Sequence, residues 1–392
     1  MTKKLLCALA VVGFVTVPTS ELEAQSLFNS AGLGRPVDAI DGRARAMGSF
    51  GIGLRGGSIS PADPAATAWL ARPSGVMVAQ PSWTEASRDG VDAGDFRGTR
   101  FPLVGIAYPV LGGMGRVQLG SFLDQRFEGQ RTLTVELGGT AFDVVDGFTQ
   151  DGGVATASLG YSRMISPDVA VGLDVARYTG SVQRRLSRDF GDLDLDGAEP
   201  FTSSGSWRYA GTSVTAGVGA DLGSVGRAAA SVRWSSTLEA DPSSTTDGSA
   251  RSFDLPLELR IGGSAVLAPG LVLAASAMHA DWSDIADDLM VDTSVGNASG
   301  FGVGLELPNV RLLGRSAPLR FGYRYSGLPF AHGQGESGSE RAFTGGLGFA
   351  FNETNGVLLA GADVSVERGE RSAGTLSEDF WRVTVALRVA GF

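Results

Sequence analysis

The sequence predicts an all-β protein: a transmembrane antiparallel β-barrel of about fourteen strands with an N-terminal hatch or plug segment. Three observations support this fold class. Apolar and polar residues alternate with a period of two from Gly75 onward, short turns alternate with long polar loops, and the chain begins with an export signal. The predicted organisation is a signal peptide over residues 1–24, a hatch or plug over 25–74 and a barrel over 75–392.

The first residues have the pattern of a cleaved secretory signal. Lys3 and Lys4 give a basic start, residues 5–17 are almost wholly apolar, and a polar stretch leads to a cleavage site after Ala24. Cys7, the single cysteine, lies inside this signal. The mature chain is therefore predicted to have no thiol, which excludes disulfides, cysteine nucleophiles and thiolate metal sites.

Composition narrows the class of protein further. Beyond the signal no run of about eighteen apolar residues occurs, so a helical membrane protein is excluded. Glycine accounts for 57 of 392 residues, roughly twice its average usage, which favours strands and turns over helices. A net charge of −10 argues against nucleic acid as a partner.

Several segments have one apolar and one polar face. In residues 255–267 the odd positions are apolar or small, whereas the even positions include charged side chains, and residues 319–326 and 382–389 repeat the split. Because hydrocarbon cannot hydrogen-bond peptide groups, such strands must close into a barrel, with the polar face turned to the lumen. The charged residues predicted to face the lumen are Glu258, Arg260, Arg320, Arg324, Arg382 and Arg388.

The predicted strands are 75–86, 99–108, 115–138, 152–165, 168–185, 205–222, 225–240, 253–268, 270–284, 298–308, 317–329, 341–351, 356–367 and 379–392. Tight turns are predicted at 166–168, 223–226, 268–270 and 352–356, and long polar loops at 87–98, 139–151, 186–204, 241–252, 284–297, 329–340 and 368–378. Short turns at one rim and long loops at the other are typical of bacterial barrels, with the short turns in the periplasm.

The alternative fold is a soluble sandwich or propeller, whose strands also alternate but whose loops should not sort by length. The chain end favours the barrel, since Phe392 supplies the terminal aromatic residue that we expect the barrel-assembly machinery to read. Phe392 falls on the polar face shared with Arg382 and Arg388. A bulge at Gly391 would turn it to the apolar face of the last strand.

Residues 26–74 do not alternate and contain the patches 48–53 and 61–70, rich in glycine and small residues. Met47, Phe50, Ile52 and Trp69 need burial, so we expect this segment to fold into the lumen as a plug rather than hang below the barrel. Asp63 or Thr67 is predicted to cap a short helix that runs towards Trp69.

Residues 45–48 (Arg-Ala-Met-Gly) followed by 63–66 (Asp-Pro-Ala-Ala) resemble the hatch opening of the FadL-like long-chain fatty-acid transporters and the related PorV-like proteins. Asp63 stands where those families usually have Asn, and Ser49 where they usually have Gly. Residues 255–285 and 318–329 resemble later strands of the same families. The resemblance implies a fourteen-stranded barrel with a hatch, in which the ligand path runs past Met47, Gly48, Phe50, Ile52, Asp63, Pro64 and Trp69.

The leading functional prediction is an outer-membrane, porin-like channel, without a cofactor, for passive uptake of hydrophobic small molecules. Its expected partners are outer-membrane lipid and lipopolysaccharide, the apolar ligand and the assembly machinery. The alternative is a PorV-like interaction protein of a secretion or surface-anchoring system. An enzyme, resting on His279 and Asp281 with Ser283 nearby in sequence, is the least favoured hypothesis; the chain is expected not to be one.

Two further motifs, an acidic run and a glycine-rich run, can each be interpreted as structural or as functional. Asp192, Asp194, Asp196 and Gly197 resemble the start of a calcium loop, but Ser203 stands where the distal acidic ligand is needed. No metal site is predicted there, although calcium bridging to lipopolysaccharide is a hypothesis. The glycines of residues 300–304 lie within a strand and are expected to relieve crowding where the plug meets the wall.

Overall fold

The computed structural model describes residues 26–137, 140–190, 201–246, 248–289, 295–330, 338–354 and 357–391. The predicted signal peptide, the acidic motif Asp192, Asp194 and Asp196, and the terminal Phe392 lie outside the described residues.

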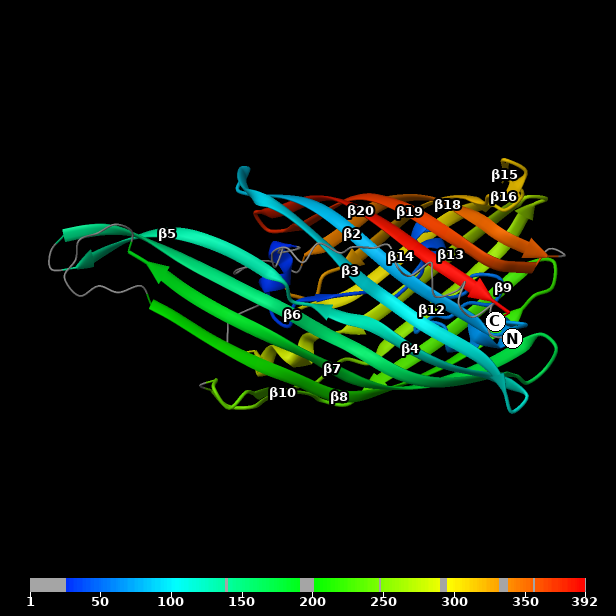
Figure 1. Ribbon diagram of the computed structural model, residues 1–392, viewed down its shortest axis with the longest axis horizontal. Helices are drawn as coiled ribbons and strands as arrows, with labels where there is room; N and C mark the ends of the chain where they lie inside the picture. Colours follow the sequence, from blue (N-terminus) through cyan, green and yellow to red (C-terminus); the bar gives the residue numbers. More distant parts are fainter. Residues whose placement is uncertain are drawn as a thin grey trace, which may run out of the picture.

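The wall is a closed antiparallel barrel of fourteen strands, as predicted (Figure 1). Each wall strand pairs with its neighbours in the chain, and the last pairs with the first through registers such as Met77↔Leu387. The wall consists of β2 (Ser74–Arg88), β3 (Val91–Val110), β4 (Gly113–Asp124) continued by β5 (Phe127–Leu137), β6 (Thr140–Met164), β7 (Val169–Asp189), β8 (Phe201–Asp221), β9 (Gly226–Ser235) continued by β10 (Leu238–Pro242), β11 (Arg251–Phe253) continued by β12 (Glu258–Ala268), β13 (Leu271–Asp281), β14 (Asn297–Leu307), β17 (Leu319–Gly327), β18 (Ser339–Thr354), β19 (Val357–Ala373) and β20 (Leu376–Ala390).

The two faces of the strands differ as the alternation predicts. Along β12, Leu259 and Ile261 are exposed on the exterior, whereas Glu258 and Arg260 are buried inside. An apolar exterior suits acyl chains, and the polar interior suits a lumen. Among the described residues no helix is long and apolar enough to cross a membrane.

Several predicted boundaries are wrong because strands continue beyond the part that an apolar pattern marks. Predicted loops 87–98 and 368–378 are hairpins, in which the chain turns at Asp89–Gly90 and at Gly374–Thr375. Strand β6 likewise begins at Thr140, inside the predicted loop 139–151. Beyond the apolar band the outward positions need not be apolar, and inward positions include the buried Val144 and Leu376, so an apolar exterior with a polar interior gives no signal there. Strands β5 to β8 rise far past the rest of the rim (Figure 1).

Three predicted strands are broken. The segments 115–138, 225–240 and 253–268 each divide into two strands, and the break in the third places Leu255 in the interior rather than on the exterior. The predicted strand 270–284 ends at Asp281, where the short 3₁₀ helix η4 (Ser283–Asp288) begins. Between β14 and β17 the chain forms a small separate hairpin of β15 (Arg311–Leu312) and β16 (Arg315–Ser316).

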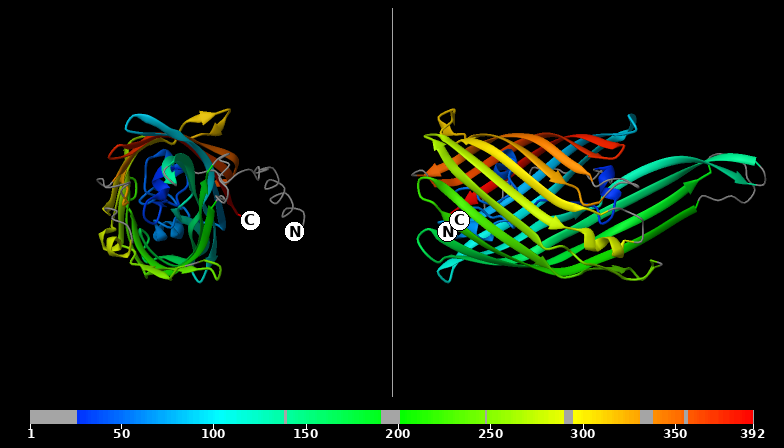
Figure 2. Two further views of the ribbon diagram at one scale, coloured as in Figure 1. Left: turned by 90° about the vertical axis from the view of Figure 1, so that its left-hand side faces the viewer. Right: turned by 180° about the vertical axis from the view of Figure 1, so that it is seen from behind.

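Residues 26–73, called the hatch segment below, fold inside the barrel (Figure 2, left view, blue). The segment contains the 3₁₀ helix η2 (Leu27–Ser30), the two-residue strand β1 (Arg35–Pro36), the helix α2 (Gly42–Ala46) and the 3₁₀ helix η3 (Pro64–Trp69). Met47, Phe50 and Ile52 are fully buried, as their apolar side chains require.

Glycines let the hatch segment lie directly against the wall. A Cβ added at Gly302 would overlap the backbone oxygen of Gly48, and one at Gly304 or Gly322 would overlap the backbone of Met47. Gly48 itself has a φ of +61°, a conformation that L side chains rarely adopt. The prediction that the glycines of 300–304 relieve crowding at the plug is confirmed.

Candidate functional site: the hatch segment and the luminal cavity

The candidate site is the contact between the hatch segment and the wall, and it begins at η3. Asp63 caps this helix by accepting a hydrogen bond from the Ala66 backbone N–H at 3.0 Å, as predicted. The other carboxylate oxygen accepts from Arg227 on β9 at 2.9 Å. The same guanidinium lies 4.1 Å from the ring centroid of Trp69. One wall arginine therefore holds both ends of η3.

A second wall arginine holds η3 from the opposite strands. Arg116 on β4 donates to the Pro64 carbonyl at 2.6 Å and to the Thr67 hydroxyl at 2.8 Å. Its charge is balanced by Asp174 on β7, whose oxygen lies 2.8 Å from Nε of Arg116. Both side chains are buried.

We expect Asp174→Leu to destabilise the barrel, because it leaves the Arg116 charge buried and without a carboxylate. Breaking a buried ion pair costs about 3–5 kcal/mol, whereas replacing both partners by apolar residues is often neutral. The free energy of unfolding in urea, measured in lipid or detergent, should therefore fall in Asp174→Leu and largely recover in Arg116→Met/Asp174→Leu. A double variant no more stable than the single one would contradict the assignment.

Helix α2 is held by a chain of alternating charges. Asp41 caps it by accepting from the Ala44 backbone N–H at 2.8 Å, and Arg43 donates two hydrogen bonds to Glu306 on β14, at 2.9 and 2.8 Å. Arg320 on β17 then bridges Glu306 and Asp363, each at 2.6 Å. Arg388 completes the chain by pairing with Asp363. The helix is thus tied to the wall by hydrogen bonds and charge pairs.

The turn between β1 and α2 carries the central anion, Asp38. Its two oxygens lie 3.0 Å from Arg260 and 2.6 Å from Arg324. Burial by itself raises the pKa of Asp38, but the guanidiniums of Arg324, Arg260 and Arg45 outweigh burial and hold that pKa below its usual range. Asp38 therefore stays ionised and keeps the hatch segment bound to two wall strands.

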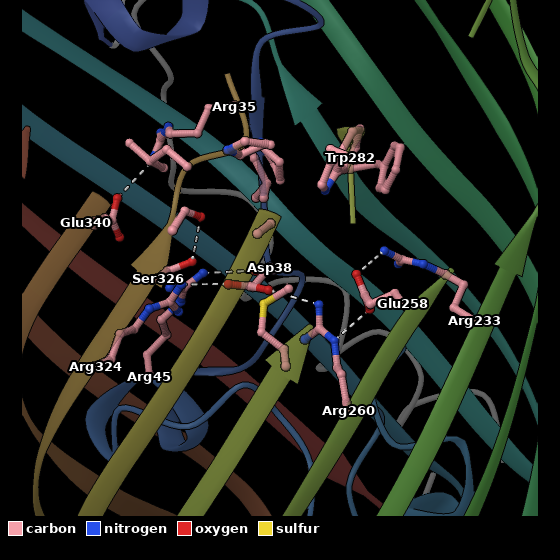
Figure 3. Close-up of a pocket in the computed structure, with 18 of the residues that line it drawn as sticks. Arg35, Asp38, Arg45, Arg233, Glu258, Arg260, Trp282, Arg324, Ser326 and Glu340 are labelled. Atoms are coloured by element: carbon pink, nitrogen blue, oxygen red, sulfur yellow. Dashed lines mark hydrogen bonds and ion pairs between the residues drawn. The ribbon is translucent and has the colours of Figure 1, made fainter. Parts of the chain in front are cut away.

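A cavity lies over this part of the hatch segment, between β1 and the walls (Figure 3). Its free volume is about 50 Å³, enough for a few water molecules, whereas a ligand pocket usually needs about 300 Å³ or more. Figure 3 shows Arg45 and Arg324 beside Asp38, and Trp282 on the opposite side. The described lumen is therefore closed at this level.

Near the rim that β5 to β8 overhang, two further carboxylates, those of Glu378 and Glu340, hold the hatch segment. Glu378 on β20 accepts from the Ser26 hydroxyl at 2.7 Å and from the Leu27 backbone N–H at 2.6 Å. Glu340 on β18 pairs with Arg371 at 2.6 Å and with Arg35 of the hatch segment at 3.4 Å. The start of the described chain is thus buried and bound near this rim of the barrel.

The wall is interrupted beside β1. The ladder between β3 and β4 ends at Leu103↔Gly120, and the described part of β5 pairs with β6 alone. In the place of β3, the hatch strand β1 pairs with β4 through Arg35↔Asp124. Arg126 reaches across the interruption to the Thr99 carbonyl at 3.1 Å, and its own carbonyl accepts from Asn29 of the hatch segment at 3.0 Å. The hatch segment is therefore in direct contact with this interruption of the wall.

The structure locates each residue that the sequence singled out. Glu258, Arg260, Arg320, Arg324 and Arg382 are buried in the interior, and Arg388 is there with 29% of its side chain exposed. Met47, Gly48, Phe50, Ile52, Asp63, Pro64 and Trp69 all lie in the hatch segment, and Trp69 alone among them is not fully buried. Their role in a ligand path stays a prediction.

Sequence reasoning missed the residues that hold the hatch segment. They are Arg35, Asp38, Arg43, Arg45, Arg116, Asp174, Arg227, Glu306, Glu340, Asp363, Glu367, Arg371 and Glu378. A signal was present for the wall members, because isolated charges such as Arg116 and Glu306 stand on the inward phase of apolar strands. Which of them pair with the hatch depends on positions across the barrel, which the local sequence does not contain.

His279 and Asp281, the basis of the enzyme hypothesis, lie near the end of β13. His279 is exposed, and its ring nitrogen lies 2.7 Å from the Ser299 hydroxyl. Asp281 accepts from the Ser283 backbone N–H at 3.0 Å, which caps the turn into η4. Both contacts have a structural explanation at the rim of the barrel. Among the described residues no group of three His, Cys, Asp or Glu side chains is arranged to hold a metal ion.

No family model matches the chain, and no curated protein matches it in sequence. Several solved structures do match the chain in fold. A Pseudomonas aeruginosa FadL homologue has a TM-score of 0.61 at 11% identity, covering 91% of this chain and 99% of its own. The P. putida toluene transporter TodX has a TM-score of 0.57 at 15% identity, covering 92% and 99%. The CymD monoaromatic hydrocarbon channel has 0.56 at 13%, covering 90% and 97%.

The fold and the lipid-compatible exterior define the class: an outer-membrane β-barrel with its N-terminal segment inside the lumen. Within that class the chain has the FadL-like fold, as the resemblance of residues 45–48 and 63–66 implied.

Proposed function

We propose that this protein is an outer-membrane channel for the passive uptake of hydrophobic small molecules, and that the hatch segment is its gate. The observation that carries the proposal is the way the hatch segment fills the lumen. It leaves about 50 Å³ free in the central cavity, and charge pairs and hydrogen bonds attach it to the wall. Such contacts can be exchanged for water when the segment shifts, so the closed state is reversible.

The route we propose runs from the extracellular rim to the cavity and then sideways. Phe122, Met278 and Trp282 line the cavity on its apolar side. Phe122 belongs to the stretch of β4 that pairs with β1 instead of β3, next to the interruption in the wall. A shift of β1 would therefore widen the cavity and uncover the side opening together. The solved structures of similar fold that are named as toluene and hydrocarbon channels support an apolar substrate.

The proposal is tested by uptake into vesicles. Lipid vesicles containing the purified protein and a trapped enzyme that oxidises toluene should accumulate product faster than vesicles without protein. Because toluene also crosses lipid by itself, lipopolysaccharide-rich vesicles, through which it diffuses slowly, are the useful test membrane. If vesicles with and without the protein take up toluene equally fast, the proposed channel is wrong. If removing residues 26–70 leaves uptake unchanged, the proposed gate is wrong.

The PorV-like alternative, an interaction protein of a secretion or surface-anchoring system, stays a prediction from the sequence. Contacts with lipopolysaccharide and with the barrel-assembly machinery likewise stay predictions.

A further inference from the structure

The luminal cavity is lined by an unusual number of buried arginines. Arg35, Arg45, Arg100, Arg324 and Arg382 come from the hatch segment and from β3, β17 and β20, and each is at most 7% exposed. With Arg233 and Arg260 the lining contains seven arginines but only three carboxylates, those of Asp38, Glu258 and Glu340. The cavity is therefore lined by an excess of positive charge.

Several of these guanidinium groups have donors that nothing accepts. Within the described residues, Nε and Nη1 of Arg45, Nε and Nη1 of Arg324, Nη1 of Arg100 and Nε of Arg382 are buried and have no hydrogen-bond partner. The nearest carboxylates to Arg45 and Arg100, those of Glu367 and Asp124, lie at 3.8 Å, too far for a hydrogen bond. A buried charged donor without an acceptor is costly, so the group is incomplete as it stands.

Mutual repulsion adds to this cost. Burial and the charge of neighbouring Arg371 lower the pKa of Arg35 to about 9, although Glu340 opposes them. Burial and the charge of Arg324 lower the pKa of Arg45 to about 10, although Glu367 opposes them. An anion placed among these side chains would accept the unpaired hydrogen bonds and relieve the repulsion at the same time.

We propose that this cavity, once a shift of β1 has widened it beyond its present 50 Å³ or so, is a binding site for a compact organic carboxylate of benzoate size. The carboxylate would lie among Arg45, Arg100 and Arg324, and its ring would face Phe122 and Trp282. The inference rests on the proposed function and names one substrate class for it. The apolar wall is short and charged side chains surround it, so a long alkyl chain would lie against charges that it cannot hydrate.

The test is calorimetric titration of the purified full chain in detergent with benzoate and with its neutral isostere benzamide. Benzoate should bind saturably and benzamide should not. Arg45→Gln and Arg100→Gln should each weaken benzoate binding about tenfold or more, the effect expected for one charge-assisted hydrogen bond. Each substitution removes buried unpaired donors but also one hydrogen bond, from Arg45 to the Asp38 carbonyl or from Arg100 to Gln80, so the heat-modifiable migration of a folded barrel should be checked for both variants.

Arg341→Gln is the matched control, since Arg341 lies on β18 beside Glu340 but is 63% exposed and pairs with Glu370. It should leave benzoate affinity unchanged. Equal binding of benzamide, unchanged affinity in Arg45→Gln and Arg100→Gln, or tighter binding of a long-chain carboxylate than of benzoate would overturn the proposal. Toluene uptake without benzoate binding would refute this site alone, and benzoate binding without toluene uptake would refute the proposed function alone.

Discussion

Oxidation of the double variant Ala39→Cys/Gly120→Cys is expected to abolish uptake, and reduction is expected to restore it. Ala39 belongs to the hatch segment next to Asp38, and Gly120 lies on β4 at the end of its ladder with β3. A Cβ at Gly120 would lie 3.2 Å from that of Ala39. Disulfides join Cβ atoms at about 3.5–4.5 Å, so a shift of a few tenths of an ångström suffices to form the bond.

The expected effect is large because the bond fixes the part of the hatch segment that must move in the proposed mechanism. The two single variants, treated with the same oxidant, should take up toluene as the wild type does. Cys7 does not interfere if the leader is removed as predicted. Full uptake by the oxidised double variant, with the bond verified by mass spectrometry, would show that residues 38–40 do not gate the path.

Gly302→Leu is expected to produce the opposite result, a barrel that leaks more than the wild type. The new side chain would occupy the space of the Gly48 backbone, which cannot rotate away as a side chain could. Overpacking of this kind costs about 1–3 kcal/mol. If only the closed state is destabilised by that amount, the ratio of closed to open hatch falls roughly 5- to 150-fold. Uptake and ion leakage should rise together.

Gly345→Leu is the control for the loss of glycine from a strand. A Cβ at Gly345 would meet its nearest neighbours, atoms of Arg320 and Phe321, at 3.8 Å, an ordinary contact away from the hatch segment. This variant should fold and stay as tight as the wild type. If Gly302→Leu also stays tight, with the heat-modifiable migration of a folded barrel, the hatch segment tolerates displacement there without opening.

The sequence predicted the number and order of the wall strands because lipid imposes a period of two wherever a strand crosses it. The same rule explains the errors, since β2, β3, β6, β19 and β20 continue where no lipid imposes a pattern. It also predicted which charges face inward, such as Arg320 and Arg382. It did not predict which wall charges pair with the hatch segment, because those partners lie far apart in the sequence.

The hatch segment shows the limit most clearly. Burial of Met47, Phe50 and Ile52 and the cap at Asp63 follow from side-chain chemistry alone. Helix α2 was not predicted, because it spans only Gly42–Ala46 and presents no repeating apolar face. The pairing of β1 with β4 was not predicted either, since two residues give no strand signal and the partner lies 87 positions away at Pro36↔Leu123.

Ion conductance across planar lipid membranes tests the central claim, that the hatch segment closes the barrel, most directly. The wild-type protein should insert with little or no steady current, and the variant that lacks residues 26–70 should give a large, stable current at the same voltage. A wild-type barrel that conducts as well as the truncated one would contradict the account, because the lumen would then be open with residues 26–70 in place.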